Sequence, residues 1–267
     1  MTYQAGFIGC GSMGGALARA VAAAGANGIA LCDRDTEKTA VLAGACVAKV
    51  VDNATLAREC RYIFLGVKPQ VYPAAIAEIA PVLRDRDCDS FVLVSMAAGV
   101  SIAGVEKMLG FPCPIIRIMP NTPCAVGAGV TVYAANALVT PEAEATFRAL
   151  MVKSGALYAL SEEKIDAAGA LSGCGPAFVY LFAEALADAG VEVGLTREQA
   201  AAYAAGTLKG AAEMLLTYGH PAALKDAVCS PGGTTIAGVH ALEEGGFRAA
   251  VMNAVTAAYD RTMELKK

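Results

Sequence analysis

The stretch Gln4–Gly14, which reads QAGFIGCGSMG, decides the fold of this chain. An apolar run that we predict as a strand ends at Ile8, the pattern Gly9-x-Gly11-x-x-Gly14 follows, and an alanine-rich helical stretch then runs to about Ala24. Glycines at this spacing permit a tight turn and let a dinucleotide pyrophosphate approach the backbone at the helix N-terminus. The bare pattern is weak evidence, but its position between a strand and a helix is what a dinucleotide-binding fold requires. A merely structural strand–turn–helix is the alternative.

Apolar runs alternate with helical patterns through the first 160 residues or so. We predict further strands at 28–32, 46–50, 62–67, 91–95, 114–118, 130–134 and 156–160. We predict helices at 35–43, 54–59, 73–83, 101–109 and 141–151. Nearly continuous apolar runs such as Tyr62–Val67 are typical of strands buried on both faces of a parallel sheet. The alternation predicts an α/β fold with a Rossmann-like, doubly wound sheet.

After about Ser161 the pattern changes to helices alone, at 164–171, 176–189, 196–218 and 246–266. We therefore expect two domains, a dinucleotide-binding domain at 1–162 and an all-helical dimerisation and substrate domain at 163–267. Residues 176–189 are apolar nearly all round, which implies burial on every side of that helix. We expect an intertwined homodimer, or a higher homo-oligomer, through the helical domain; a monomer with a buried central helix is the alternative.

Composition narrows the function classes. The chain has 267 residues, 56% of them hydrophobic, with a net charge of −4 and no run of Lys or Arg, so a nucleic-acid partner has little electrostatic support. Charges and Gly or Pro residues interrupt every candidate membrane span, and the first 30 residues lack the basic leader of a signal peptide. None of the nine cysteines forms a C-x-x-C pair, which argues against a zinc site or disulfide framework and favours the cytoplasm.

Three breaks and one charged pair follow predicted strands and outline a crevice. Asp33 and Arg34 end the second strand; a carboxylate there commonly accepts from the ribose hydroxyls of NAD, whereas an arginine can pair with the extra phosphate of NADP. This sequence offers both, so it does not decide between them. The breaks lie at 66–70, 95–100 and 119–123, and ligands collect at that edge of an open α/β sheet.

Ser230-Pro-Gly-Gly-Thr-Thr-Ile236 is the strongest local signal in the helical part. Two glycines, two threonines and a helical stretch describe exposed backbone N–H groups at a helix start, which suit an anion. A capped helix start after a turn is the alternative. Other candidates are weaker: His220, His240 and Lys209 fit no catalytic pattern well, and Glu162, Glu163 and Asp166 fit helix-start acids, with Glu162 kept as a candidate substrate contact.

Several of these blocks, in the same order, resemble the pyrroline-5-carboxylate reductase family from end to end. The most specific block is Leu224–Ile236, LKDAVCSPGGTTI. Supporting blocks are Phe7–Met13, Val67–Gln70, Ala97–Val100, Leu171–Ala177 and Gly245–Arg248. The resemblance implies a dinucleotide domain with a helical domain that swaps into a dimer.

The resemblance also implies roles for particular residues. Around the cofactor they are Gly9, Cys10, Gly11, Ser12 and Met13 for the pyrophosphate, Asp33 and Arg34 for the adenosine ribose, Asn53 near the adenine, and Val67, Lys68, Pro69, Ala97 and Ala98 along the cofactor. For the substrate they are Ser230, Gly233, Thr234 and Thr235 of the partner subunit, with the Thr235 hydroxyl near the ring nitrogen. Ala227 departs from an asparagine of some members, and Asp33 could weaken the NADPH preference that the family implies, which leaves NADH open.

The reaction that the resemblance implies is hydride transfer from the nicotinamide to the imine carbon of L-1-pyrroline-5-carboxylate, giving L-proline. A substrate that arrives as an iminium needs no strong general acid, which agrees with a site of hydroxyls and backbone donors. The competing interpretations are a beta-hydroxyacid dehydrogenase, which would need Lys209 as a base, and a dinucleotide sensor without turnover. The anion-binding turn at 230–235 argues against the sensor.

Overall fold

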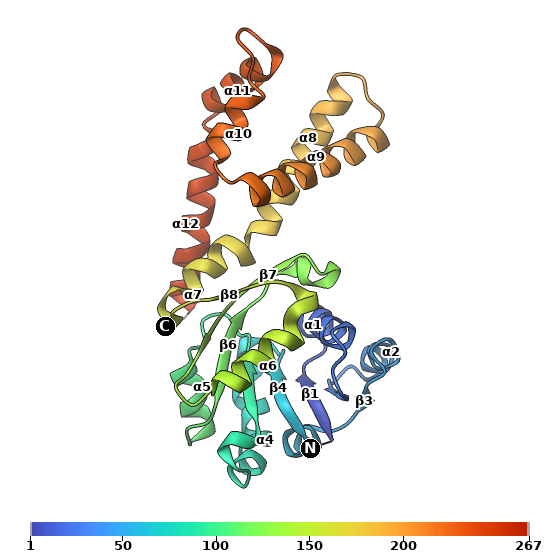
Figure 1. Ribbon diagram of the computed structural model, residues 1–267, viewed down its shortest axis with the longest axis vertical. Coiled ribbons are helices and arrows are strands. Elements are labelled where there is room, and N and C mark those ends of the chain that lie inside the picture. Colours follow the sequence, from blue (N-terminus) through green and yellow to red (C-terminus); the bar gives the residue numbers. More distant parts are fainter. Residues whose placement is uncertain (1, 266–267) are drawn as a thin grey trace. The chain divides into compact units, whose positions relative to one another are not determined.

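The computed structural model describes residues 2–265, and its central feature is an eight-stranded sheet in the order β3-β2-β1-β4-β5-β6-β7-β8 (Figure 1). The strands are β1 (Tyr3–Ile8), β2 (Ile29–Cys32), β3 (Lys49–Val50), β4 (Cys60–Leu65), β5 (Val92–Ser95), β6 (Ile115–Met119), β7 (Gly129–Ala135) and β8 (Gly155–Ala159). Neighbouring strands run parallel except β6 and β7. The doubly wound α/β prediction is confirmed, and β7 and β8 at one edge of the sheet run antiparallel to the other six strands.

Helices connect the strands. They are α1 (Ser12–Ala23), α2 (Thr36–Cys46), α3 (Asn53–Glu59), α4 (Tyr72–Arg84), α5 (Ile102–Leu109), α6 (Pro141–Met151) and α7 (Glu162–Ala168), with short 3-10 turns η1 (Pro69–Val71), η2 (Cys88–Ser90), η3 (Thr122–Val126) and η4 (Val152–Ser154). Four of these helices begin where a side-chain oxygen of Asp35, Asp52, Ser101 or Thr140 accepts from a backbone N–H of the first turn. Such N-caps satisfy donors that the helix leaves without an acceptor.

The sheet is buried on both faces because successive strand residues point to opposite sides. Phe7 and Phe64 stack at 4.5 Å between ring centroids in the core shared with α1, α2 and α6. Their neighbours Ile8, Ile63 and Leu65 enter the opposite core, shared with α3, α4 and α5. These two cores hold the carboxyl ends of the strands rigidly, and the site is built at those ends.

One boundary predicted from the sequence is wrong. We predicted a helix at 35–43 and a strand at 46–50, but α2 continues through Cys46 and β3 has only two residues. Cys46 is buried in the core, which extends the helix, and Val47 then ends it in the left-handed region with a φ of 52°. The strand can begin only after that turn.

The later helices are η5 (Gly169–Gly173, a π-helical turn), α8 (Gly175–Glu192), α9 (Arg197–Tyr218), α10 (Pro221–Ala227), α11 (Thr234–Glu244) and α12 (Phe247–Leu265). The start of α9 at Thr196 is confirmed, with a capping box in which Thr196 and Gln199 each accept from the other's backbone N–H. Close packing of α8 against α9 requires small residues: a Cβ on Gly190 would lie 2.9 Å from the Cβ of Ala200.

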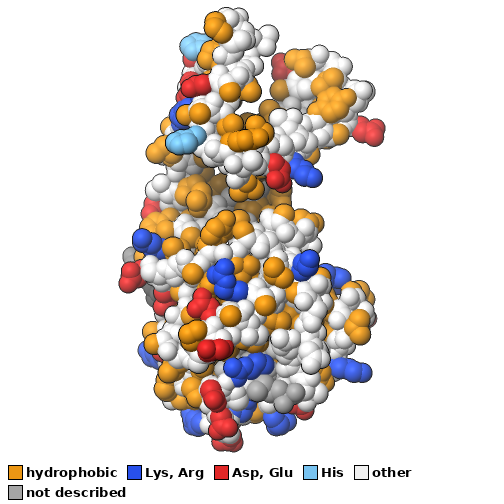
Figure 2. Space-filling view, viewed as in Figure 1, with side chains coloured by type: hydrophobic (Ala, Val, Ile, Leu, Met, Phe, Trp, Pro, Cys, Tyr) orange, Lys and Arg blue, Asp and Glu red, His pale blue; other side chains and the backbone are white. Residues whose placement is uncertain are grey.

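The described chain divides into two compact units, Gly175–Ala257 and the remainder. The Gly175–Ala257 unit buries few of its apolar side chains. Its core cluster is Ala187, Ala200 and Ala204, while large side chains such as Leu181 and Leu216 are 67% and 79% exposed. Figure 2 shows apolar side chains gathered on the surface of these helices. The domain boundary predicted at 162/163 stays a prediction. In the structure, α7 and η5 group with the sheet in one compact unit.

One helical stretch, Glu162–Glu192, is long and apolar enough to cross a membrane by length and composition, with a mean hydropathy of 1.4. We expected charges and Gly or Pro residues to interrupt every candidate span; Asp166 and Glu184 are charged residues within this stretch, whereas its glycines and proline do not end the helix. The helix passes Gly169, Gly173 and Pro176 without ending, through the π-helical turn η5. Because a helix that packs between two subunits is equally long and apolar, this stretch alone does not indicate a membrane protein.

Candidate functional site

The site lies where β1 and β4 are neighbours, because the chain leaves β1 toward one edge of the sheet and returns beyond it. Ligands bind at such a reversal, outside the carboxyl ends of the strands. Gly9 follows β1 with a φ of +95°, in a region that favours glycine, and a Cβ there would lie 2.6 Å from both Gly66 C and Val67 N. A Cβ on Gly14 would lie 2.0 Å from Gly9 O. These two glycines are therefore required by the protein's own packing.

Gly11 differs from its two partners in the motif. A Cβ built there meets nothing within 4 Å, and no side chain of the described residues caps the α1 N-terminus beside it. The protein itself therefore leaves room at Gly11, next to backbone N–H groups that lack helical acceptors. That free space is what a pyrophosphate on this loop would need, so the residues present fit a dinucleotide.

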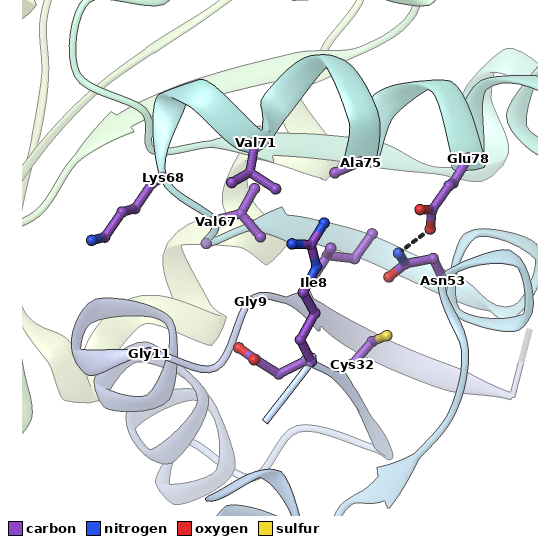
Figure 3. Close-up of a pocket in the computed structure, with 13 residues that line it drawn as sticks. Ile8, Gly9, Gly11, Cys32, Asn53, Val67, Lys68, Val71, Ala75 and Glu78 are labelled. Atoms are coloured by element: carbon purple, nitrogen blue, oxygen red, sulfur yellow. Dashed lines mark hydrogen bonds between the residues drawn. The ribbon is translucent and has the colours of Figure 1, made fainter. Parts of the chain in front are cut away.

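A cavity of about 370 Å³ continues from this loop between β2 and α4. It is lined by Ile8, Gly9, Gly11, Cys32, Asp33, Arg34, Asn53, Gly66, Val67, Lys68, Val71, Ala75 and Glu78 (Figure 3). The structure thus brings together seven residues that we predicted along the cofactor, Gly9, Gly11, Asp33, Arg34, Asn53, Val67 and Lys68. This cavity would fit an elongated ligand whose phosphates lie beside Gly11.

Asp33 is fixed by the backbone of two neighbouring loops. Its Oδ2 accepts from the Cys10 N–H at 2.5 Å, and its Oδ1 accepts from the Asp35 N–H at 3.0 Å. Burial, and then the charge of Asp33, raise the pKa of the Cys10 thiol to about 12. Cys10 is therefore a neutral thiol at physiological pH, and its backbone rather than its sulfur contributes to the site.

Asn53 lines the same cavity as Asp33. Its Nδ2 donates to Glu78 Oε2 at 2.5 Å, an interaction drawn as a dashed line in Figure 3. Its Oδ1 is buried and has no hydrogen-bond partner among the residues that the structure describes. A buried acceptor of this kind suits a ligand N–H group. Glu78 was not predicted, since an acidic residue in a helical pattern reads as solvent-facing.

Tyr72 joins two walls of the crevice through its hydroxyl. We did not predict it as a site residue from the sequence. Its hydroxyl donates to Leu65 O at 2.8 Å, at the end of β4, and accepts from the Met96 and Ala97 N–H groups at 3.0 and 3.1 Å, after β5. Burial raises the pKa of this phenol, which keeps it protonated. Tyr72 thereby sets the spacing between the loop of Val67–Pro69 and that of Ala97–Ala98.

Glu162 takes part in a buried ion-pair cluster. Arg117 of β6 is 1% exposed and donates to Asp166 Oδ1 at 2.6 Å and to Glu162 Oε1 at 3.3 Å. The same Glu162 oxygen accepts from the Ile102 N–H at 2.6 Å, at the start of α5. This cluster joins α7 and α5 to the sheet, so Glu162 and Asp166 have structural partners. Neither pairing could be read from the sequence, where Arg117 interrupts an apolar strand.

The turn at 230–235 is exposed at the start of α11. Gly233 is the N-cap residue, Gly232 has a φ of +68°, and within the described helix start no side chain caps α11. The first N–H groups of the helix therefore face solvent, as the sequence predicts.

The weaker catalytic candidates, Lys209, His220 and His240, lie on or at the start of separate helices. Lys209 is exposed on α9, His220 is the N-cap residue of α10, and His240 lies 3.4 Å from Glu244 of the same helix. Between residues 2 and 265 no group of His, Cys, Asp and Glu side chains could hold a metal ion. The nine cysteines, all within this range, are free thiols.

Comparison with known proteins identifies the family. The sequence profile described as pyrroline-5-carboxylate reductase dimerisation matches residues 162–265, and that described as NADP oxidoreductase, coenzyme F420-dependent, matches residues 4–99. The chain is 41% identical to the pyrroline-5-carboxylate reductase of Escherichia coli (strain K12) over 272 aligned residues, covering 100% of both chains. It belongs to the pyrroline-5-carboxylate reductase family.

Solved structures agree with this assignment. The pyrroline carboxylate reductase of Plasmodium falciparum, solved with NADP bound, is 35% identical with a TM-score of 0.88 over 99% of this chain and 98% of that one. The pyrroline-5-carboxylate reductase of Coxiella burnetii is 33% identical with a TM-score of 0.90 over 100% of both chains. The chain is thus an oxidoreductase of the pyrroline-5-carboxylate reductase family, and the resemblance stated from its motifs is confirmed.

Proposed function

We propose that this chain reduces L-1-pyrroline-5-carboxylate to L-proline with NAD(P)H, the last step of proline biosynthesis. The observation that carries the proposal is the match to the Escherichia coli enzyme over the whole of both chains. The crevice at the β1–β4 reversal supports it, because its open Gly11 loop and buried Asn53 acceptor fit a nicotinamide dinucleotide.

The bound dinucleotide would supply the hydride, and this chain's residues would hold and orient it. Gly9 to Met13 would hold the pyrophosphate, with the Gly11, Ser12 and Met13 N–H groups as donors, because the Gly9 and Cys10 N–H groups already donate to Cys32 O and Asp33 Oδ2. Asp33 and Arg34 would lie beside the adenosine ribose, and Asn53 would lie beside the adenine. Val67, Lys68 and Pro69, with Ala97 and Ala98, would line the rest. Tyr72 holds the two wall loops together by its hydrogen bonds to Leu65 O and from the Ala97 N–H, and so keeps this channel at a fixed width.

Residues of the turn at 230–235 would bind the substrate. We propose that the substrate carboxylate rests on the backbone of Gly233, Thr234 and Thr235 at the α11 N-terminus, with Ser230 beside it, and accepts from the Thr234 and Thr235 N–H groups. The Gly233 N–H is not available, because it donates to Ser230 O at 3.0 Å. The Thr235 hydroxyl would lie near the ring nitrogen, where a hydrogen bond orients the imine and the nitrogen ends protonated. Glu162 remains a proposed substrate contact through its second oxygen, since Oε1 accepts from Ile102 and Arg117.

We further propose that two chains pair through their helical units, so that the turn of one subunit serves the crevice of the other. An apolar groove of about 450 Å³ between α8 and α12, lined by Phe178, Leu181, Phe182, Ala185, Leu186, Ala189, Leu242, Phe247, Ala250, Val251 and Ala254, supports pairing. An exposed apolar groove of this kind favours association with another apolar surface. The free thiols suit a reducing compartment, and we place the enzyme in the cytoplasm.

The test is oxidation of NADH and NADPH by the purified full-length chain with L-1-pyrroline-5-carboxylate, together with the Thr235→Ala and Lys209→Ala variants. We expect activity in the wild type, a fall of about 10- to 100-fold for Thr235→Ala from the loss of one hydrogen bond to a charged group, and no change for Lys209→Ala. Loss of activity in Lys209→Ala would instead favour a hydroxyacid dehydrogenase. Absence of turnover with intact dinucleotide binding would favour a sensor.

A further inference from the structure

The adenosine end of the crevice carries carboxylates at the positions where an extra phosphate would bind. We propose that Asp33 and Asp35 make this chain select NADH over NADPH, an inference that rests on the proposed function. Their oxygens occupy backbone donors that the 2′-phosphate of NADPH would need, and Asp35 also pairs with Lys38.

Asp33 is held at the end of β2 by the Cys10 and Asp35 N–H groups, at 2.5 and 3.0 Å. Because both contacts are to backbone, the carboxylate cannot rotate away when a ligand enters. A carboxylate accepts about four hydrogen bonds, so it can still accept from the hydroxyls of an unmodified ribose. A 2′-phosphate in the same place would meet a fixed negative charge at close range.

Asp35 occupies the N-terminus of α2, the other place where a phosphate could find backbone donors. Its Oδ1 accepts from the Lys38 N–H at 3.0 Å, and its Oδ2 pairs with Lys38 Nζ at 2.9 Å. The Lys38 N–H, followed by the Lys38 side chain, lowers the pKa of Asp35, so this group stays ionised near neutral pH. The donor and the cation that would favour a phosphate here are therefore already engaged.

Arg34 is the cation next to Asp33 in the cavity wall, and Lys68 follows Val67 in the same wall. Glu78 lines the same cavity. The pKa of Cys32, also in the wall, is raised first by burial and then by Asp52, Glu78 and Asp33, so the fields of these carboxylates overlap in the cavity. An arginine here can stack on the adenine without a phosphate.

The experiment is equilibrium titration of the full-length protein with NADH and NADPH at fixed ionic strength, followed by nicotinamide fluorescence and without substrate. The dissociation constant for NADH should be roughly tenfold or more below that for NADPH, the scale of one charge repulsion in a partly solvated site. The double variant Asp33→Asn, Asp35→Ser should bring the dissociation constants for NADH and NADPH closer together or reverse their order. Serine at 35 keeps a good N-cap, and asparagine at 33 keeps an acceptor, so the fold is preserved.

Glu37→Gln is the matched control, because it removes a charge from the same helical turn without touching the engaged donors. In this control, the ratio of the NADPH to the NADH dissociation constant should stay within about twofold of the wild-type ratio, since an exposed charge is screened by salt. Tighter or equal binding of NADPH by the wild type, or an equal shift in the control, would overturn the selection by Asp33 and Asp35 while leaving the reductase assignment in place. Binding of neither dinucleotide would overturn both.

Discussion

The hydroxyl of Tyr72 lies 3.1 Å from the backbone nitrogen of Ala97, joining a helix that follows β4 to the loop that follows β5. Ala97 is 2% exposed, so its N–H has no access to water if that hydroxyl is removed. An unsatisfied buried donor costs about 1–3 kcal/mol. The cofactor walls therefore depend on a residue that we do not expect to touch the cofactor.

Tyr72→Phe should lower the free energy of unfolding by about 1–3 kcal/mol and weaken dinucleotide binding, because the two wall loops lose their common partner. Urea unfolding and dinucleotide titration measure the two effects. Tyr62→Phe is the control: Tyr62 is equally buried but donates to Ala143 O, away from the crevice. It should lose stability without losing affinity. Equal affinity losses in both variants would remove the positioning role of Tyr72.

Gly11→Ala and Gly14→Ala should behave oppositely. Nothing lies within 4 Å of a Cβ at Gly11, so the alanine variant should fold normally and bind the dinucleotide at least roughly tenfold more weakly. At Gly14 the added Cβ would lie 2.0 Å from Gly9 O, so overpacking should destabilise the fold itself by about 1–3 kcal/mol or more. Thermal unfolding and titration separate the effects. Normal affinity in Gly11→Ala would contradict the pyrophosphate position.

Thr234→Pro removes one backbone N–H from the proposed carboxylate site while leaving α11 intact. Proline is well tolerated at the first helical position, and Gly233, with a ψ of 173°, has the extended conformation that precedes proline readily. We expect KM for the imino acid to rise by about tenfold and dinucleotide affinity to stay unchanged. Arg197→Pro, at the first position of α9, is the control and should leave KM unaltered. An unchanged KM in Thr234→Pro would show that the Thr234 N–H does not bind the substrate carboxylate.

Alkaline pH should destabilise the protein through its buried thiols. Burial raises the pKa values of Cys10, Cys60 and Cys113 from 9.0 to about 12. The native state therefore retains protons that the unfolded chain loses above pH 9, and stability is full below that pH and falls as pH rises toward 12. Each thiol contributes a slope of about 1.4 kcal/mol per pH unit. Urea unfolding at several pH values should show a shallower decline in Cys113→Ala; an identical slope would contradict this.

The elements of the fold could be predicted because their signals are local. The glycine motif, the apolar runs of β1, β4 and β5 and the cap at Thr196 each depend on a few adjacent residues. The end of α2 could not, because Cys46 remains helical through burial against distant residues. The reversed direction of β7 and β8 likewise depends on packing that no short motif encodes.

The site divides in the same way. Gly9, Gly11, Asp33 and Arg34 stand at positions that the strand order assigns, so the sequence predicts them. Tyr72, Glu78 and Arg117 act through partners between 7 and 49 positions away in the chain. A buried tyrosine or arginine in an apolar pattern shows only that a partner must exist, not which one.

We propose that the crevice of one subunit and the 230–235 turn of another form one active site. The most direct measurement joins two inactive chains, Gly11→Asp and Thr234→Pro with Thr235→Ala, each with a different tag, and isolates the mixed dimer by both tags. One site of that dimer would combine an intact crevice with an intact turn, so we predict about half of wild-type activity per dimer. A mixed dimer as inactive as its two parents would contradict the claim.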